Sequence, residues 1–328
     1  MILDKFQDTI KKYNLVAKSD RIIVGVSGGP DSVALIYLLY NLSRELKISL
    51  HIAHLDHMIR KDSFKDSEFV NNLAVKLKVP VTTARINIKE IAKIKRGSLE
   101  EIARNARLGF LLKAARDFKA TKIALGHNLD DQAETVLMRI IRGSGLYGLS
   151  GILPKRVIHG YQVIRPLIEI KRKEIEAFLR KKKIIPCRDS SNSQDIYFRN
   201  KIRNQLLVLL EKGYNRNIKE VLSNMAENVG QDYEYLSRIA KRTMSYLKRK
   251  VILNKFIRLH PSIQRLVLRL NIVEIKGDTR RITFQHIREL EDLILNRPVD
   301  SVVDLPGNVS VVKRKSYLLF YRRTVERQ

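Results

Sequence analysis

Hydrophobic residues in the first half of the chain follow two alternating patterns. Short runs rich in apolar and β-branched residues predict strands at 21–26, 48–55, 81–88 and 122–128. Between and after them, apolar residues recur every three or four positions, which predicts helices at 32–46, 66–78, 98–118 and 130–143. Strands that alternate with helices form a parallel sheet with helices on both faces. The pattern therefore predicts an α/β domain that binds its ligand beyond the carboxyl ends of the strands.

The pattern changes near residue 170. Helices are predicted at 171–183 and 197–213, followed by a long helical stretch through 249 and by amphipathic helices at 261–275 and 283–294. The last segments, "SVVDL" and "VSVVKRKSYLLFYR", flank a Pro-Gly-Asn turn and predict short antiparallel strands. We expect residues 1–212 to form the α/β domain. Residues 213–328 are expected to form a smaller, mainly helical C-terminal domain that ends in these strands.

Charge indicates the class of partner. The 328 residues include 63 Lys and Arg but only 34 Asp and Glu, which gives a formal net charge of +29 and a pI near 10.2. Such an excess favours a nucleic-acid partner. A lysine-rich proteome is the alternative explanation.

Cysteine content and hydropathy indicate the compartment. Cys187 is the only cysteine, which excludes an intrachain disulfide framework and a metal site built from several cysteines. We see no secretory leader and no apolar run of about 18 residues that would span a bilayer. The expectation is a cytoplasmic protein without a membrane partner.

The segment "SGGPDS" follows the first predicted strand and opens the next helix. It contains Ser27, Gly28, Gly29, Pro30, Asp31 and Ser32. The glycines let backbone amides approach an anion, and the start of the helix adds partial positive charge. Asp31 would repel a phosphate unless a cation lay between them, which points to Mg²⁺ held by Asp31. The alternative is a simple helix cap made by Asp31 or Ser32.

This loop resembles the PP-loop of the ATP pyrophosphatases. The resemblance implies an enzyme that cleaves ATP between its α and β phosphates and adenylates an oxygen of a second substrate. The cofactors it implies are ATP and Mg²⁺.

A second group of polar residues lies in "DDQAET". On a helix, Asp130 and Asp131 share a face with Glu134. Converging carboxylates hold a cation or an amine, or accept a proton. Helix capping by Asp130 or Asp131 beside an exposed glutamate is the alternative.

Residues 130–152 resemble the signature of the bacterial tRNA(Ile)-lysidine synthetases. Segments 54–63, 101–110, 164–178 and 188–210 agree in order and spacing, so the resemblance covers roughly residues 20–212. It implies adenylation of the C2 oxygen of the wobble cytidine in a CAU-anticodon tRNA(Ile). Free L-lysine then attacks C2 and AMP leaves, so that the tRNA reads AUA instead of AUG.

The resemblance also implies roles for individual residues. Arg107 is expected to bind ATP or the adenylated intermediate, and His54 to line the ATP site together with the loop 27–32. Asp131, Glu134 and Arg199 are expected to form the lysine site. The catalytic set implied is thus Asp31, Arg107, Asp131, Glu134 and Arg199.

Two basic segments are candidate docks for the tRNA. Either is also consistent with an ordinary solvated face. Their residues are Lys171, Arg172, Lys181 and Lys182 in the first segment, and Lys241, Arg242, Lys248, Arg249 and Lys250 in the second.

Two other functions are compatible with these features. A tRNA thiolase of the same superfamily would share the loop, but thiolation usually draws on several cysteines. A tRNA-binding protein without catalysis would have no need of a phosphate-binding loop. The sequence leaves the oligomeric state open.

Overall fold

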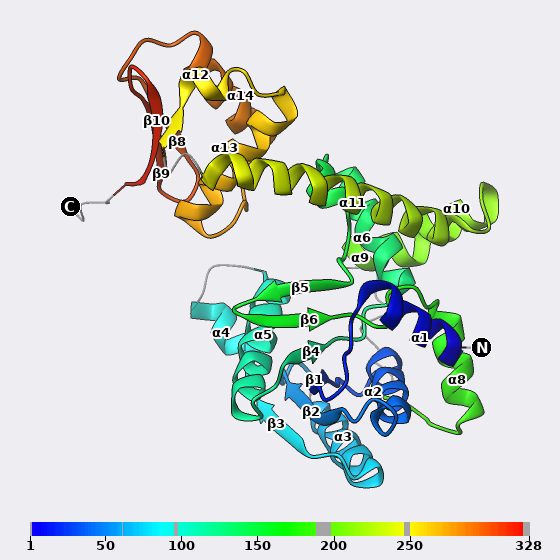
Figure 1. Cartoon of the computed structure of the whole chain (residues 1–328). Helices are drawn as coiled ribbons and strands as arrows, with labels where there is room; N and C mark the ends of the chain where they lie inside the picture. Colours follow the sequence, from blue (N-terminus) through cyan, green and yellow to red (C-terminus); the bar gives the residue numbers. More distant parts are fainter. Residues whose placement is uncertain (1, 61, 95–97, 188–197, 246–249, 324–328) are drawn as a thin grey trace. The chain divides into compact units, whose positions relative to one another are not determined.

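The computed structural model describes residues 2–60, 62–94, 98–187, 198–245 and 250–323 (Figure 1). The chain forms two compact units, Met1–Asn228 and Val229–Gln328. Among the described residues, no helix is long and apolar enough to cross a membrane.

A six-stranded sheet organises the first unit, in the order β3-β2-β1-β4-β6-β5. The parallel strands are β1 (Arg21–Gly25), β2 (Ser49–Asp56), β3 (Val81–Arg85), β4 (Lys122–Ala124) and β6 (Tyr161–Ile164). Strand β5 (Lys155–Ile158) is antiparallel to β6 at one edge. The α/β class with a mostly parallel sheet is therefore confirmed.

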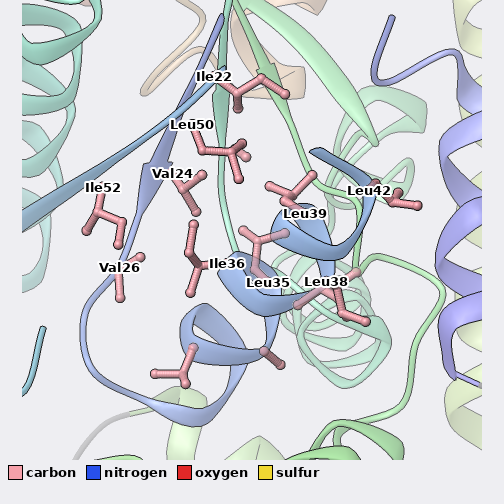
Figure 2. Close-up of a cluster of buried hydrophobic side chains, with 14 of the residues drawn as sticks. Ile22, Val24, Val26, Leu35, Ile36, Leu38, Leu39, Leu42, Leu50 and Ile52 are labelled. Atoms are coloured by element: carbon pink, nitrogen blue, oxygen red, sulfur yellow. The ribbon is translucent and has the colours of Figure 1, made fainter. Parts of the chain in front are cut away.

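Alternate residues of the central strands pack against different helices. Ile22 and Val24 of β1 belong to a core shared with helix α2 (Pro30–Ser43), as Figure 2 shows. The same core includes side chains of α1 (Ile2–Tyr13), α3 (Ser63–Leu77) and α8 (Arg172–Lys181). Ile23 of β1 instead joins a cluster with α5 (Leu99–Asp117), next to α4 (Ile88–Ile94). The two-residue period of a strand thus places helices on both faces.

A smaller cluster lies beyond the sheet. Helix α6 (Leu129–Ile141) packs there against a π-helical segment (Ile202–Leu206), α10 (Leu207–Gly213) and the start of α11 (Ile218–Ser245). Helix α9 (Phe198–Lys201) directly precedes the π-helical segment. The buried members of the cluster include Ala133 and Val136 of α6, Ile202, and Leu222 of α11. The single turn α7 (Leu146–Leu149) follows α6.

The two units join inside α11 rather than at the predicted boundary of 212/213. Leu222 and Ala226 lie beyond that boundary, yet they are buried against α6. The first turns of α11 therefore complete the core of the first unit. Sequence pattern alone did not reveal this, because α11 is a single continuous helix.

The second unit has its own core and sheet. Strands β7 (Lys250–Ile252), β10 (Tyr317–Arg322), β9 (Val309–Lys313) and β8 (Val302–Leu305) form an antiparallel sheet in that order. Residues of α12 (Leu253–Phe256), α13 (Pro261–Lys276) and α14 (Phe284–Leu295) pack with it. The predicted strands around the Pro-Gly-Asn turn are confirmed.

Several elements were not predicted from the sequence. These are α1, α4, α7, the hairpin β5–β6, the short strand β7 and α12. The hairpin turns at His159 and Gly160, both with positive φ, as a tight two-residue turn requires. Alternating apolar residues on either side of Gly160 were the available signal for this hairpin.

Candidate active site

The loop after β1 depends on a glycine in the left-handed region and on a contact with Cys187. Gly28 adopts φ +89, and a Cβ there would lie 3.3 Å from Cys187 Sγ, so a side chain would be strained and crowded. The Cys187 amide donates a 3.0 Å hydrogen bond to the Gly28 carbonyl and anchors the loop. Burial, together with a hydrogen bond to Asp66, raises the pKa of the Cys187 thiol to about 11, so this thiol is neutral at pH 7.

The start of α2 leaves backbone donors available. Its N-cap is Gly29, without a side-chain cap, and Pro30 occupies the first turn. Ser32 Oγ donates to the Gly29 carbonyl at 2.9 Å and accepts from the Ser27 amide at 3.1 Å. Within the described part of the chain, the amides of Gly28, Asp31 and Ser32 have no acceptor. The alternative in which Asp31 or Ser32 caps the helix is therefore wrong, and the loop instead offers N–H groups to an anion.

Asp31 faces the turn that opens α6. Asn128 Nδ2 donates a 2.8 Å hydrogen bond to Asp31 Oδ1. A Cβ on Gly126 would lie 3.1 Å from the Asp31 carbonyl carbon, so glycine allows the turn to approach α2 this closely. Burial raises the pKa of Asp31 to about 6, with a further contribution from Asp131, although Arg172 opposes the shift.

The cap of α6 uses Asn128, which the sequence analysis did not single out. Asn128 Oδ1 accepts from the Asp131 amide at 2.9 Å, and Asp131 Oδ2 accepts from the Asn128 amide at 3.1 Å. This reciprocal capping box directs the other oxygen of Asp131 toward the arginines described below. An asparagine three residues before an aspartate was the sequence signal.

Glu134 is fully buried and ionically paired. Arg199 Nε donates to Glu134 Oε2 at 2.7 Å, while Arg203 donates to Oε1 at 2.6 Å and to Oε2 at 3.0 Å. Arg203 lies in the π-helical segment, and Arg199 lies one turn earlier, in α9. The structure thus brings the predicted lysine-site residues together and adds Arg203, whose pKa is raised by Glu134 and Asp131 despite burial.

Arg172 lies in the same cluster, although the sequence analysis assigned it to a tRNA dock. Its Nη2 is 3.3 Å from Asp131 Oδ1 and 4.0 Å from Asp31 Oδ2, and its Nη1 is 3.8 Å from Glu134 Oε1. The start of α8 lies beside α6, because the Arg172 amide is hydrogen-bonded to Asp130. Arg172 therefore belongs to the carboxylate cluster, and its contact with tRNA stays a prediction.

Asp130 has a structural role next to this cluster. It accepts from the Arg172 amide at 2.8 Å and pairs with Lys219 Nζ at 3.1 Å. Despite burial, these contacts lower the pKa of Asp130. Asp130 therefore joins α6, α8 and α11, and Asp131 is the carboxylate that faces the cluster.

Positive side chains surround His127 at the carboxyl end of β4. Burial, with the charges of Arg165, Arg107, Arg199 and Arg104, lowers its pKa well below the ordinary value, so the ring is neutral. Its Nδ1 has no partner among the described residues. Arg104 and Arg107 have no carboxylate partner within the described ranges either, so this side of the site favours an anion.

The contacts of His54 differ from those expected of an ATP-binding residue. It is 2% exposed; its Nδ1 donates to the Val26 carbonyl at 2.8 Å, and its Nε2 lies 3.0 Å from Ser67 Oγ. Both ring nitrogens are thus occupied by the protein, and His54 supports the end of β1 directly.

The remaining basic candidates differ in their surroundings. Lys171 forms an ion pair with Glu220, whereas Lys181 and Lys182 are exposed. Lys241 and Lys250 are exposed in the second unit, as is Arg242, and Lys250 lies over the Tyr317 ring. Lys248 and Arg249 lie outside the described residues.

A Mg²⁺ ion would have few protein ligands here. The described part of the chain contains no group of three or more His, Cys, Asp or Glu side chains that could hold a metal. Mg²⁺ at nucleotide sites is commonly held by one or two carboxylates together with phosphate oxygens and water. Asp31, with Oδ2 not hydrogen-bonded to Asn128, fits that mode.

Comparison with known proteins identifies the family. A family model described as a PP-loop domain matches residues 2–210. A tRNA(Ile)-lysidine synthase of Clostridioides difficile is 38% identical over 97% of this chain and 70% of its own length. One from Caldanaerobacter subterraneus is 35% identical over 98% of this chain and 69% of its own.

A solved structure supports the fold. The chain resembles the U34-tRNA thiolase NcsA of Methanococcus maripaludis with a TM-score of 0.59, at 19% identity over 70% of this chain and 78% of the other. At that identity the likeness extends to the fold alone. The sequence matches and the PP-loop together lead to one conclusion: the chain belongs to the tRNA(Ile)-lysidine synthase family of PP-loop enzymes.

Proposed function

We propose that the protein ligates free L-lysine to C2 of the wobble cytidine of a CAU-anticodon tRNA(Ile), through an adenylated tRNA intermediate. The observation that carries this proposal is the convergence of three elements. Asp31 of α2, Asp131 and Glu134 of α6, and Arg199 of α9 all meet beyond the carboxyl ends of β1 and β4.

The loop side of the site suits the first half-reaction. ATP would place its β and γ phosphates on the free amides of Gly28, Asp31 and Ser32, and Mg²⁺ held by Asp31 would offset phosphate charge. Arg107 and neutral His127 lie on the side where the α phosphate would meet the cytidine oxygen. Unpaired cations there would stabilise the charge that develops on the transferred phosphoryl group.

The carboxylate side suits the second half-reaction. Asp131 has long contacts of 3.3–3.5 Å to three guanidinium groups, whereas Glu134 has contacts of 2.6–3.0 Å to Arg199 and Arg203. We therefore assign the lysine amine chiefly to Asp131, which can exchange a long contact for the ammonium group. Glu134 holds Arg199 and Arg203 in place near the lysine.

A labelling assay tests the proposal. The protein is incubated with CAU-anticodon tRNA(Ile), ATP, Mg²⁺ and labelled lysine, and label is measured in the RNA together with AMP and pyrophosphate. Label in RNA that requires ATP is expected. Asp31→Ala should abolish pyrophosphate release while leaving tRNA binding nearly intact, because Asp31 acts on the nucleotide.

The rival functions give other results in this assay. A thiolase would release AMP only with a sulfur donor and would leave lysine free. A protein that only binds tRNA would release no pyrophosphate. Either result would overturn the proposal.

A further inference from the structure

Arg172 differs from the other two arginines of the cluster in how it is held. Arg199 and Arg203 each have a hydrogen bond of 2.7 Å or less to Glu134. Within the described parts of the chain, the side chain of Arg172 has one hydrogen bond, 3.3 Å long, to Asp131, and longer ion pairs of 3.8 Å to Glu134 and 4.0 Å to Asp31. Its guanidinium is therefore central in the cluster but weakly bonded.

The backbone of Arg172 is held by a shorter hydrogen bond than its side chain. The Arg172 amide donates to Asp130 Oδ2 at 2.8 Å, and Asp130 is held in turn by Lys219. Lys171 and Glu174 form the capping interaction that begins α8. A rotation about side-chain bonds would therefore move the guanidinium without displacing the helix.

The position of the guanidinium conflicts with the cations of the proposed reaction. Asp31 and Asp131 belong to opposite sides of the site, and the Nη2 atom of Arg172 lies between them. A lysine ammonium at Asp131 would meet this guanidinium on the same carboxylate oxygen, and like charges at such a separation repel. A bound triphosphate next to Asp31 offers Arg172 a stronger partner, because guanidinium groups pair well with phosphate.

From this geometry we propose that Arg172 couples the nucleotide and lysine sites. Without nucleotide it occupies the place of the lysine ammonium at Asp131. When ATP binds, Arg172 turns toward the phosphates and gives its place at Asp131 Oδ1 to the lysine ammonium, while Arg199 and Arg203 keep their contacts with that oxygen. Nucleotide therefore binds first and lysine second. This inference rests on the proposed function, since it takes lysine and ATP as the ligands.

Direct binding measurements test the coupling. Lysine affinity is measured by equilibrium dialysis with Mg²⁺, in the presence and absence of α,β-methylene ATP, which cannot be cleaved at the α–β bond. The wild-type protein should bind lysine about tenfold more tightly with the analogue. In Arg172→Gln the affinity without analogue should rise, so that the two affinities agree within about twofold.

Two further variants control for folding and for charge. Arg180→Gln removes an exposed arginine of the same helix, which pairs with Glu176 at 4.0 Å, and it should behave as the wild type. Arg172→Lys keeps the positive charge on a shorter side chain, so it should retain part of the coupling. This variant keeps the test valid if the glutamine variant fails to fold.

The other outcomes are decisive. If folded Arg172→Gln still binds lysine more tightly with the analogue than without it, the coupling role is wrong. The same holds if this variant binds no lysine under either condition. If wild-type protein binds lysine equally well with and without the analogue, the inference fails while the proposed function stands. If wild-type protein binds no lysine even with the analogue and tRNA, the proposed lysine site fails and the inference fails with it.

Discussion

Glu134 is a buried carboxylate that is paired with two arginines. It is fully buried, and both its oxygens accept hydrogen bonds from guanidinium groups. A buried charge of this kind is stable only with its partners, and removing one side of the pair costs about 3–5 kcal/mol. Glu134 is thus a support for Arg199 and Arg203 as well as a candidate ligand.

Replacing Glu134 should separate the two half-reactions. Glu134→Gln leaves two arginines without their counter-charge, so the free energy of unfolding should fall by about 3 kcal/mol. Adenylated tRNA should still form, while its resolution by lysine slows by about 100-fold or more. Single-turnover assays on protein shown to be folded measure both steps. Loss of adenylation at saturating ATP would instead place Glu134 at the nucleotide.

Asp31 should make stability depend on pH. Its pKa is raised to about 6 by burial, above the ordinary value of 3.8. Below pH 4 the carboxyl is neutral in both folded and unfolded states, and stability is lost as the pH rises through 6 because the folded state disfavours the charge. Asp31→Asn has no carboxyl to ionise and so lacks this loss. The free energy of unfolding of the variant, relative to that of the wild type, should therefore increase by up to about 3 kcal/mol between pH 4 and 7. Urea unfolding at four pH values measures it, and a difference that shrinks with pH would contradict the assignment.

At the scale of elements, the first turn of α6 joins two functions. The capping box made by Asn128 and Asp131 fixes where the helix begins. The side-chain amide of Asn128 also donates a hydrogen bond to Asp31. The π-helical segment Ile202–Leu206 plays a comparable part on the other side, because Arg203 lies in it while Ile202 and Leu207 are buried against α6. π-Helical segments are often found at functional sites.

Two substitutions of Asn128 separate these functions. Asn128→Ala removes the cap and the bond to Asp31, so the free energy of unfolding should fall by about 1–2 kcal/mol and the KM for Mg·ATP should rise. Asn128→Ser keeps a capping oxygen but lacks the amide donor. It should recover most of the stability and keep the raised KM. Equal kinetics in the serine variant and the wild type would show that the bond to Asp31 has no part in nucleotide binding.

At the scale of the whole molecule, the excess of positive charge is the dominant feature. The net charge is +29 after all carboxylates are counted. Exposed basic residues are present in both units. Contacts between these residues and tRNA phosphates would release counterions, so affinity should fall steeply with salt. We propose that residues 213–328 contribute to tRNA binding on this ground.

A charge-neutralised variant tests the second basic segment. Replacing Lys241, Arg242, Lys248, Arg249 and Lys250 by glutamine should raise the KM for tRNA and flatten its dependence on salt, while the KM for ATP and lysine should barely change. Discrimination among anticodons should survive better than affinity, because phosphate contacts do not read bases.

A matched variant controls for total charge. It replaces five exposed lysines of the first unit outside both candidate docks: Lys18, Lys47, Lys76, Lys89 and Lys93. If the control and the test variant lose tRNA affinity equally, net charge rather than a local dock is responsible. An unchanged salt dependence in the test variant would move the dock to Lys181 and Lys182.

Local sequence was sufficient for the elements and for part of the site. The alternation of strands and helices, the loop 27–32 and the carboxylates of α6 depend on short-range patterns of hydrophobicity, glycine and capping residues, which a sequence displays directly. Thus the strands of the parallel core, and a ligand site beyond their carboxyl ends, were expected from the sequence alone. The convergence of Arg199 on Glu134 followed from family resemblance.

Only the tertiary structure decided which partners these side chains have. Arg172 and Asp131 are 41 residues apart in sequence, and Arg203 and Glu134 are 69 apart, so no periodicity relates them. Their meeting depends on how α8 and the π-helical segment pack against α6. The same holds for His54, whose ring nitrogens are occupied by Val26 and Ser67, and for α11, whose first turns complete the core of the first unit. Composition revealed an excess of lysine and arginine over acidic residues. Only packing determines which of these basic side chains face a carboxylate and which remain available for phosphate.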